Sequence, residues 1–127
     1  MRNWLSTSAR DIATLGVATW ALVGCGDVLP PPIASNAHPA VGKQLVARYG
    51  CGSCHKIAGV AGADGAAGPP LTDIKKRGYI AGVLANTTVN LEDWIMHPTV
   101  ISPATAMPDL GVSRVEARDI AAFLYAQ

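Results

Sequence analysis

Five consecutive residues, Cys51-Gly52-Ser53-Cys54-His55, constrain this chain more than any other feature of its sequence. Two thiols separated by two residues can each bond to one vinyl group of a haem, and the adjacent histidine then lies under the iron as its proximal ligand. A structural zinc site needs four ligands, commonly from a second cysteine or histidine pair, and no second pair is visible. A thioredoxin-like dithiol is expected near a βαβ pattern, which is also not visible. The motif therefore predicts one covalently attached haem c, with His55 as an iron ligand.

The amino-acid composition favours a small domain whose core includes a cofactor. The chain has 127 residues, so a single domain is expected. A domain of this size buries a modest fraction of its surface and often depends on a disulfide, metal or cofactor for stability. The chain contains only one Phe, three Tyr and three Trp, and Trp4 and Trp20 lie near the N-terminus. A haem would fill the core that so few aromatic side chains leave incomplete.

The N-terminal stretch has the parts of a bacterial export signal. Arg2 and Arg10 supply positive charge, and Ile12–Val23 is a mostly apolar run that is shorter than the roughly 20 residues of a transmembrane helix. The run ends in Leu22-Val23-Gly24-Cys25, which resembles the lipobox of bacterial lipoproteins, where the cysteine is acylated and becomes the new N-terminus. We therefore expect a lipoprotein signal peptide over residues 1–24 and lipid attachment at Cys25. An ordinary secretory signal or an uncleaved anchor is the alternative.

A tether and a folded domain are expected after this signal. Pro30-Pro31-Pro32 and the neighbouring residues lack hydrophobic periodicity, which is typical of an extended linker. The expected organisation is a flexible tether over residues 25–39 and a haem-binding domain over residues 40–127.

The net charge of the chain limits the kinds of binding partner that are expected. The formal net charge is +1, and residues 1–24 account for it, so the remainder has no net formal charge. A nucleic-acid partner is disfavoured, because it requires a clear basic excess. Four basic residues close to the cysteine motif form either a docking patch or an ordinary solvated turn: Lys56, Lys75, Lys76 and Arg77.

The residues around the motif, from Ala40 to Ala126, resemble the class I (mono-haem) cytochrome c family. Gly68-Pro69-Pro70-Leu71 matches the family's Gly-Pro-x-Leu element, which implies that the Pro69 carbonyl accepts a hydrogen bond from the second ring nitrogen of His55. Such a bond fixes the tautomer and orientation of a ligating histidine. Thr105-Ala106-Met107-Pro108 matches the family's Met-Pro element, which implies that Met107 is the sixth iron ligand.

Other residues offer alternative donors. Met96 is expected to fill the core, because it lies on a helix that ends before Pro98. His38 and His97 are expected at the surface. A thioether ligand favours Fe(II) and raises the reduction potential. With both axial positions filled, the iron has no vacancy for a substrate, so electron transfer is favoured over catalysis.

The resemblance implies an all-α class I cytochrome c fold, with three to four helices around one haem. Val41–Tyr49 suits the N-terminal helix. Ser113 and Glu116 form a capping-box pattern at the start of a C-terminal helix from about Arg114 to Ala126. In the family these two helices cross, so Gly42 is expected to allow close approach, with Phe123 or Tyr125 packed there.

A shorter helix is expected between the Gly-Pro-x-Leu and Met-Pro elements. Asn90 is the expected N-cap of a helix through Leu91, Trp94 and Ile95, which Pro98 stops. The family often places an aromatic side chain against the haem at the position of Trp94. Its indole N–H either donates to a haem propionate or the ring simply fills the core.

A narrower likeness covers Arg77 through Met107, which resembles the cytochrome c domain fused to subunit II of caa-type respiratory oxidases. Those sequences commonly carry an acidic residue where this chain has His97. They also include a copper domain and two membrane helices that have no counterpart here, so a free-standing relative is expected.

The functional expectation is a one-electron carrier and not an enzyme. It is tethered to the periplasmic face of a bacterial membrane, and it delivers electrons to a respiratory terminal oxidase or forms one of its subunits. The first alternative is the cytochrome subunit of a periplasmic dehydrogenase. Further alternatives are a haem-based ligand sensor or peroxidase, and a structural lipoprotein with a vestigial haem site.

Overall fold

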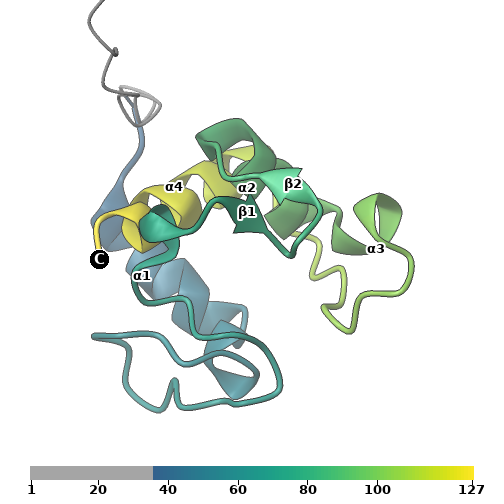
Figure 1. Ribbon diagram of the computed structural model, residues 1–127. Helices are drawn as coiled ribbons and strands as arrows, with labels where there is room; N and C mark the ends of the chain where they lie inside the picture. Colours follow the sequence, from purple (N-terminus) through teal and green to yellow (C-terminus); the bar gives the residue numbers. More distant parts are fainter. Residues whose placement is uncertain (1–35) are drawn as a thin grey trace, which may run out of the picture.

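The computed structural model describes residues 36–127 (Figure 1). The predicted signal peptide, most of the tether and the predicted lipid site at Cys25 lie outside the described residues. The helices are α1 (Pro39–Arg48), α2 (Thr88–Met96), α3 (Pro98–Ile101) and α4 (Arg114–Tyr125), with two 3-10 turns, η1 (Cys51–Ser53) and η2 (Ile74–Lys76). The expected class of fold is confirmed, with one addition. A short antiparallel hairpin joins β1 (Tyr79–Ile80) to β2 (Leu84–Ala85), and Ile80 pairs with Leu84.

Helices α1 and α4 form the main packing pair of the domain (Figure 1). Gly42, which is buried, lies at the contact between them. A Cβ atom at this position would collide with the backbone carbonyl of Asp119 and stand 2.9 Å from the Cβ of Phe123. The predicted close approach at Gly42 is therefore confirmed, and it requires a residue without a side chain.

Helix α1 begins two residues before the predicted start. Pro39 occupies its first turn, where the missing N–H costs nothing and the fixed φ suits a helix. The N–H of the preceding His38 donates to the buried carboxylate of Asp119 in α4, at 2.7 Å. This contact places a negative charge near the positive end of the α1 dipole and ties the start of α1 to α4.

Helix α4 begins with the predicted capping box. The Ser113 hydroxyl accepts from the N–H of Glu116, and the Glu116 carboxylate accepts from the N–H of Ser113 at 3.0 Å. The same carboxylate accepts from the Tyr49 hydroxyl at 2.8 Å and from the Arg48 guanidinium. These hydrogen bonds, those from Ser113 above all, lower the pKa of Glu116 to about 2. One side chain therefore caps α4 and holds the end of α1.

The predicted start of α2 was wrong. Thr87, and not Asn90, is the N-cap: its hydroxyl accepts from the N–H of Asn90 at 3.2 Å. The Asn90 side chain instead donates to the carbonyl of Ala85 at 2.9 Å. The helix does end before Pro98, but this proline occupies the first turn of α3, so it also starts a helix.

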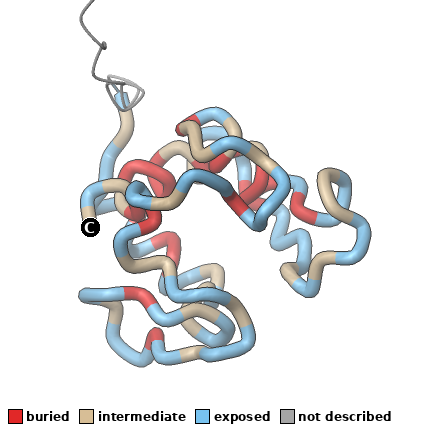
Figure 2. Tube along the Cα trace, in the orientation of Figure 1, coloured by how far each residue is buried: buried red, intermediate tan, exposed pale blue. Residues whose placement is uncertain are grey.

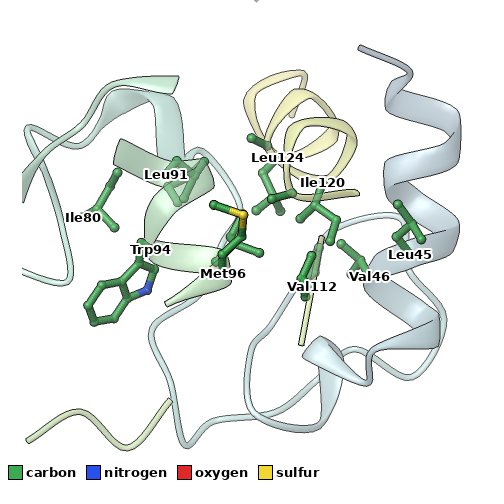
Figure 3. Packing of buried hydrophobic residues seen from close by; sticks show 14 of the residues in the cluster. Leu45, Val46, Ile80, Leu91, Trp94, Met96, Val112, Ile120 and Leu124 are labelled. Atoms are coloured by element: carbon green, nitrogen blue, oxygen red, sulfur yellow. The ribbon is translucent and has the colours of Figure 1, made fainter. Parts of the chain in front are cut away.

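The core lies where α1, α2 and α4 meet, and buried residues concentrate there (Figure 2). Figure 3 shows Ile80 and Trp94 on one side of this cluster, Leu45 and Val46 on the other, and residues of α4 between them. Within residues 36–127, no helix is long and apolar enough to cross a bilayer.

Candidate cofactor site

A cavity of about 380 Å³ lies beside this core. Its volume falls in the range of roughly 300–1,000 Å³ typical of small-molecule and cofactor sites. Side chains from every helix except α3 reach it. The lining comes from residues within 46–55, 67–71, 74–81, 91–95, 105–112 and 120–124.

The cysteine motif forms one side of the cavity. Gly50 has a left-handed conformation with φ of 67°, which turns the chain from α1 into η1 and which glycine adopts without steric cost. The Cys51 thiol is half-buried and the Cys54 thiol is exposed, and neither forms a disulfide. Burial raises the pKa of the Cys51 thiol. Both sulfurs belong to residues of the cavity lining, so one bound group can meet both.

His55 is oriented by the chain that follows it. Its Nδ1 lies 2.7 Å from the carbonyl oxygen of Pro69. A carbonyl oxygen can only accept a hydrogen bond, so Nδ1 carries the proton and donates. This leaves Nε2 as the ring nitrogen with a lone pair for a metal. Gly68 packs against the ring, since a Cβ there would stand 2.6 Å from Nδ1.

Two backbone hydrogen bonds fix the Pro69 segment in place. The Gly68 N–H donates to the Cys54 carbonyl, and the Leu71 N–H donates to the Lys56 carbonyl, each at 2.8 Å. The carbonyl that orients His55 is therefore held by the motif's own backbone.

The two methionines of the described chain occupy different environments. Met107 is partly buried and lines the cavity. Its N–H donates to the Thr105 hydroxyl at 3.2 Å, and the Thr105 N–H donates to the Ser102 carbonyl at 2.9 Å. Met96 is buried in the core between α2 and α4 (Figure 3).

The remaining predicted residues divide between cavity and surface. Trp94 is buried and lines the cavity, on the side that Figure 3 shows next to Ile80. His38 and His97 are exposed, as are the basic residues Lys56, Lys75 and Lys76.

Arg77 has a different environment from the basic patch in which the sequence placed it. It is half-buried, lines the cavity and donates from its guanidinium to the carbonyl of Pro70. Sequence reasoning also missed Tyr49, Ile74 and Leu124 as lining residues. The only local signal for Tyr49 is its place two residues before Cys51.

The donor set of the cavity fits a haem. Two thiols, one imidazole and one thioether come from residues that line a single cavity, and most of the remaining lining is apolar. Among residues 36–127, no group of three or more His, Cys, Asp or Glu side chains could hold a metal ion directly. A zinc site at the motif is therefore not supported by the described part of the chain.

Comparison with known proteins agrees with this site. Residues 39–126 match the family described as cytochrome c, and the chain belongs to this family. Membership implies a covalently bound haem c and a role in electron transfer rather than catalysis.

A relative supports the narrower likeness to oxidase subunit II. The chain is similar to the cytochrome c oxidase subunit 2 of Alkalihalophilus pseudofirmus, with 39% identity over 67 residues. The match covers 53% of this chain and 19% of that protein, so the chain spans about a fifth of its length. No solved structure gives a significant match.

Proposed function

We propose that this protein is a one-electron carrier that delivers electrons to a respiratory terminal oxidase, either as a separate donor or as a subunit. The observation that carries the proposal is that His55 and Met107 line one cavity together with both motif cysteines. The likeness to an oxidase subunit 2 supports the choice of oxidase as the partner.

The residues have separate roles in this proposal. Cys51 and Cys54 would attach the haem, and His55 through Nε2 and Met107 through its thioether would hold the iron. When bound, the haem supplies a one-electron couple at its iron. Pro69 acts through His55, because its carbonyl fixes the proton on Nδ1 and increases the basicity of the imidazole.

The surroundings of the iron set its potential. Trp94 packs against the cofactor from α2, on the evidence of its burial and its place in the lining. The apolar walls keep water away from the iron, and a neutral thioether favours Fe(II). Both effects raise the reduction potential of the iron, so that the iron would accept an electron readily.

The exposed edge of the site is the proposed route for electrons. Cys54 is exposed whereas Cys51 is half-buried, so the haem edge bonded to Cys54 is the one nearer to solvent. A partner that docks beside Cys54 gains the shortest path to the iron.

Location is the second part of the proposal. Lipid attachment at Cys25 would hold the domain, over residues 40–127, on the periplasmic face of a bacterial membrane. Mass spectrometry of the mature N-terminus tests this. Diacylglycerol on Cys25 supports it, and an unmodified Cys25 in a chain that still begins at residue 1 contradicts it.

Rapid kinetics test the oxidase proposal. Holoprotein is prepared with the cytochrome c maturation machinery, reduced, and mixed with native membranes in the absence and presence of cyanide. We expect rapid oxidation that cyanide stops, and no binding of carbon monoxide to the reduced protein. Slow oxidation that cyanide does not affect would exclude the oxidase as partner, and rapid carbon monoxide binding would favour a sensor or peroxidase.

A further inference from the structure

We infer that Asn86 and Tyr125 are positioning residues that hold one wall of the cofactor cavity, the segment of residues 74–78, against the haem. The wall includes Ile74 and Arg77, which line the cavity, and it leads into Tyr79 and Ile80, which line it as well. The inference rests on the proposed haem site, and it concerns two residues that lie outside the iron-ligand set.

Asn86 makes three hydrogen bonds through its side-chain amide. Its Nδ2 donates to the carbonyl of Ile74 at 2.7 Å and to the carbonyl of Arg77 at 2.8 Å. Its Oδ1 accepts from the Tyr125 hydroxyl at 2.6 Å. An asparagine amide has two donor hydrogens and one acceptor oxygen, so every one of these groups has a partner.

The backbone of Asn86 adds a further contact to the wall. Its N–H donates to the carbonyl of Gly78 at 3.0 Å. One residue therefore gathers the carbonyls of Ile74, Arg77 and Gly78. The Ile74 carbonyl also accepts from the Arg77 N–H, so the contacts from Asn86 act together: they hold both ends of the turn at one point and favour one position of the wall beside the cavity.

The wall has little support of its own. Its regular structure is the three-residue turn η2, and Arg77 then continues in an extended conformation. Inside the wall, the Arg77 N–H donates to the carbonyl of Ile74 at 3.0 Å. A short 3-10 turn has poorer hydrogen-bond geometry than an α-helix, so its position is set from outside.

Tyr125 connects this wall to α4, which packs against α1 and α2. It occupies the last residue of α4, and the neighbouring Leu124 is buried and lines the cavity. Burial raises the pKa of Tyr125 to about 12, so the hydroxyl keeps its proton and remains a donor at ordinary pH. The hydrogen bond to Asn86 thus fixes the wall relative to α4.

The wall also contacts the segment that orients the proposed iron ligand, His55. The Arg77 guanidinium donates to the carbonyl of Pro70, next to the Pro69 carbonyl that orients His55. Displacement of the wall would admit water beside the haem, and greater exposure of the cofactor to solvent lowers its reduction potential by stabilising the charged oxidised state.

The test uses an isosteric change in the haem-loaded protein. Asn86→Asp keeps the acceptor for Tyr125 and replaces the two donors by oxygen, which faces the carbonyls of Ile74 and Arg77. We expect the midpoint potential to shift downward, in part through the added carboxylate charge itself, and the Arg77 amide to exchange its hydrogen faster, with the amides of α4 unchanged. Tyr125→Phe should shift both quantities in the same direction by a smaller amount.

Asn90→Ala is the matched control. It removes a single side-chain hydrogen bond, to the carbonyl of Ala85 at 2.9 Å, close to Asn86 but outside the wall. We expect it to leave the potential and the Arg77 exchange rate at wild-type values. The inference is overturned if Asn86→Asp leaves the Arg77 exchange rate at the wild-type value, if Tyr125→Phe, which adds no charge, leaves the potential unchanged, or if Asn90→Ala produces the same shifts. The exchange measurement requires no electron partner, so it reports on the wall even where the proposed role with an oxidase fails.

Discussion

Gly42 in α1 lies directly against the backbone carbonyl of Asp119 in α4, with no space between them for even one carbon atom. The carboxylate of Asp119 in turn accepts from the N–H of His38, which precedes α1. The two helices are therefore joined by a close backbone contact and a hydrogen bond at almost the same place. The position of the motif depends on this joint, because Cys51 follows α1 after only two residues.

Gly42→Ala should destabilise the domain strongly. The new Cβ can be accommodated only if α1 and α4 move apart, and overpacking of this kind costs about 1–3 kcal/mol or more. Thermal unfolding of the holoprotein measures the change. Gly78→Ala is the control, since a Cβ there meets nothing within 4 Å, and it should stay within about 0.5 kcal/mol of the wild type. Equal stability of the two variants would contradict the interpretation.

Gly68→Ala should disturb the iron ligand rather than the fold as a whole. The added methyl group would displace the His55 ring, since its position lies 2.6 Å from Nδ1, and would strain the hydrogen bond to Pro69. We expect a lower yield of haem-loaded protein and altered histidine resonances in paramagnetic NMR spectra. Unchanged resonances would mean that the ring does not depend on this close packing.

Met107→Ala and Met96→Ala should have opposite effects. Met107 lines the cavity and Met96 lies in the core. Met107→Ala should remove the methionine-to-Fe(III) charge-transfer band, allow carbon monoxide to bind the reduced protein and lower the potential. Met96→Ala should preserve the band and lower the free energy of unfolding by about 2–5 kcal/mol.

Two outcomes would revise the ligand assignment. If Met96→Ala abolishes the band and Met107→Ala keeps it, Met96 is the ligand. If both variants keep the band, neither methionine is needed for it and the proposed sixth ligand is wrong.

Stability should fall in acid partly through Glu116. Its pKa is lowered from the ordinary value of 4.5 to about 2 in the folded protein, so its contribution is complete above pH 4.5 and is lost as the pH falls toward 2. Chemical denaturation of the wild type and of Glu116→Gln should show a difference in stability that shrinks over this interval. A difference independent of pH would mean that the charge of Glu116 is not what holds α1 to α4.

Short motifs could be predicted from the sequence, whereas contacts between residues that are distant in sequence could not. The cysteine motif, the Gly68-Pro69 element and the Ser113 capping box each lie within a few residues, and each carries a distinctive pattern. Asn86 and Tyr125 are 39 residues apart, and an asparagine followed by Thr87 and Thr88 has the composition of an ordinary loop. Nothing local distinguishes it from a solvated residue.

The misplaced start of α2 and the unpredicted helix α3 have the same cause. Thr87 and Asn90 are both good N-caps, and the chain geometry after β2 decides which one begins the helix. Pro98 follows the end of α2 as predicted and also begins α3, because proline suits the first turn of a helix as well. The direction of the chain after His97 decides between these roles, and tertiary packing sets that direction.

The start of α1 determines how the domain can be presented to a partner. Asn36 and His38 are held by Arg118 and Asp119 in α4, whereas α1 reaches the cavity only through its final turn, at Val46. A helix of 10 residues is about 15 Å long, so residues 1–35 join the domain roughly that far from the motif. Under the proposed lipid attachment, the domain pivots about a point remote from its haem. Encounters with a partner in the same membrane are then governed by an effective concentration that the tether length sets, and not by the concentration of the protein in the periplasm.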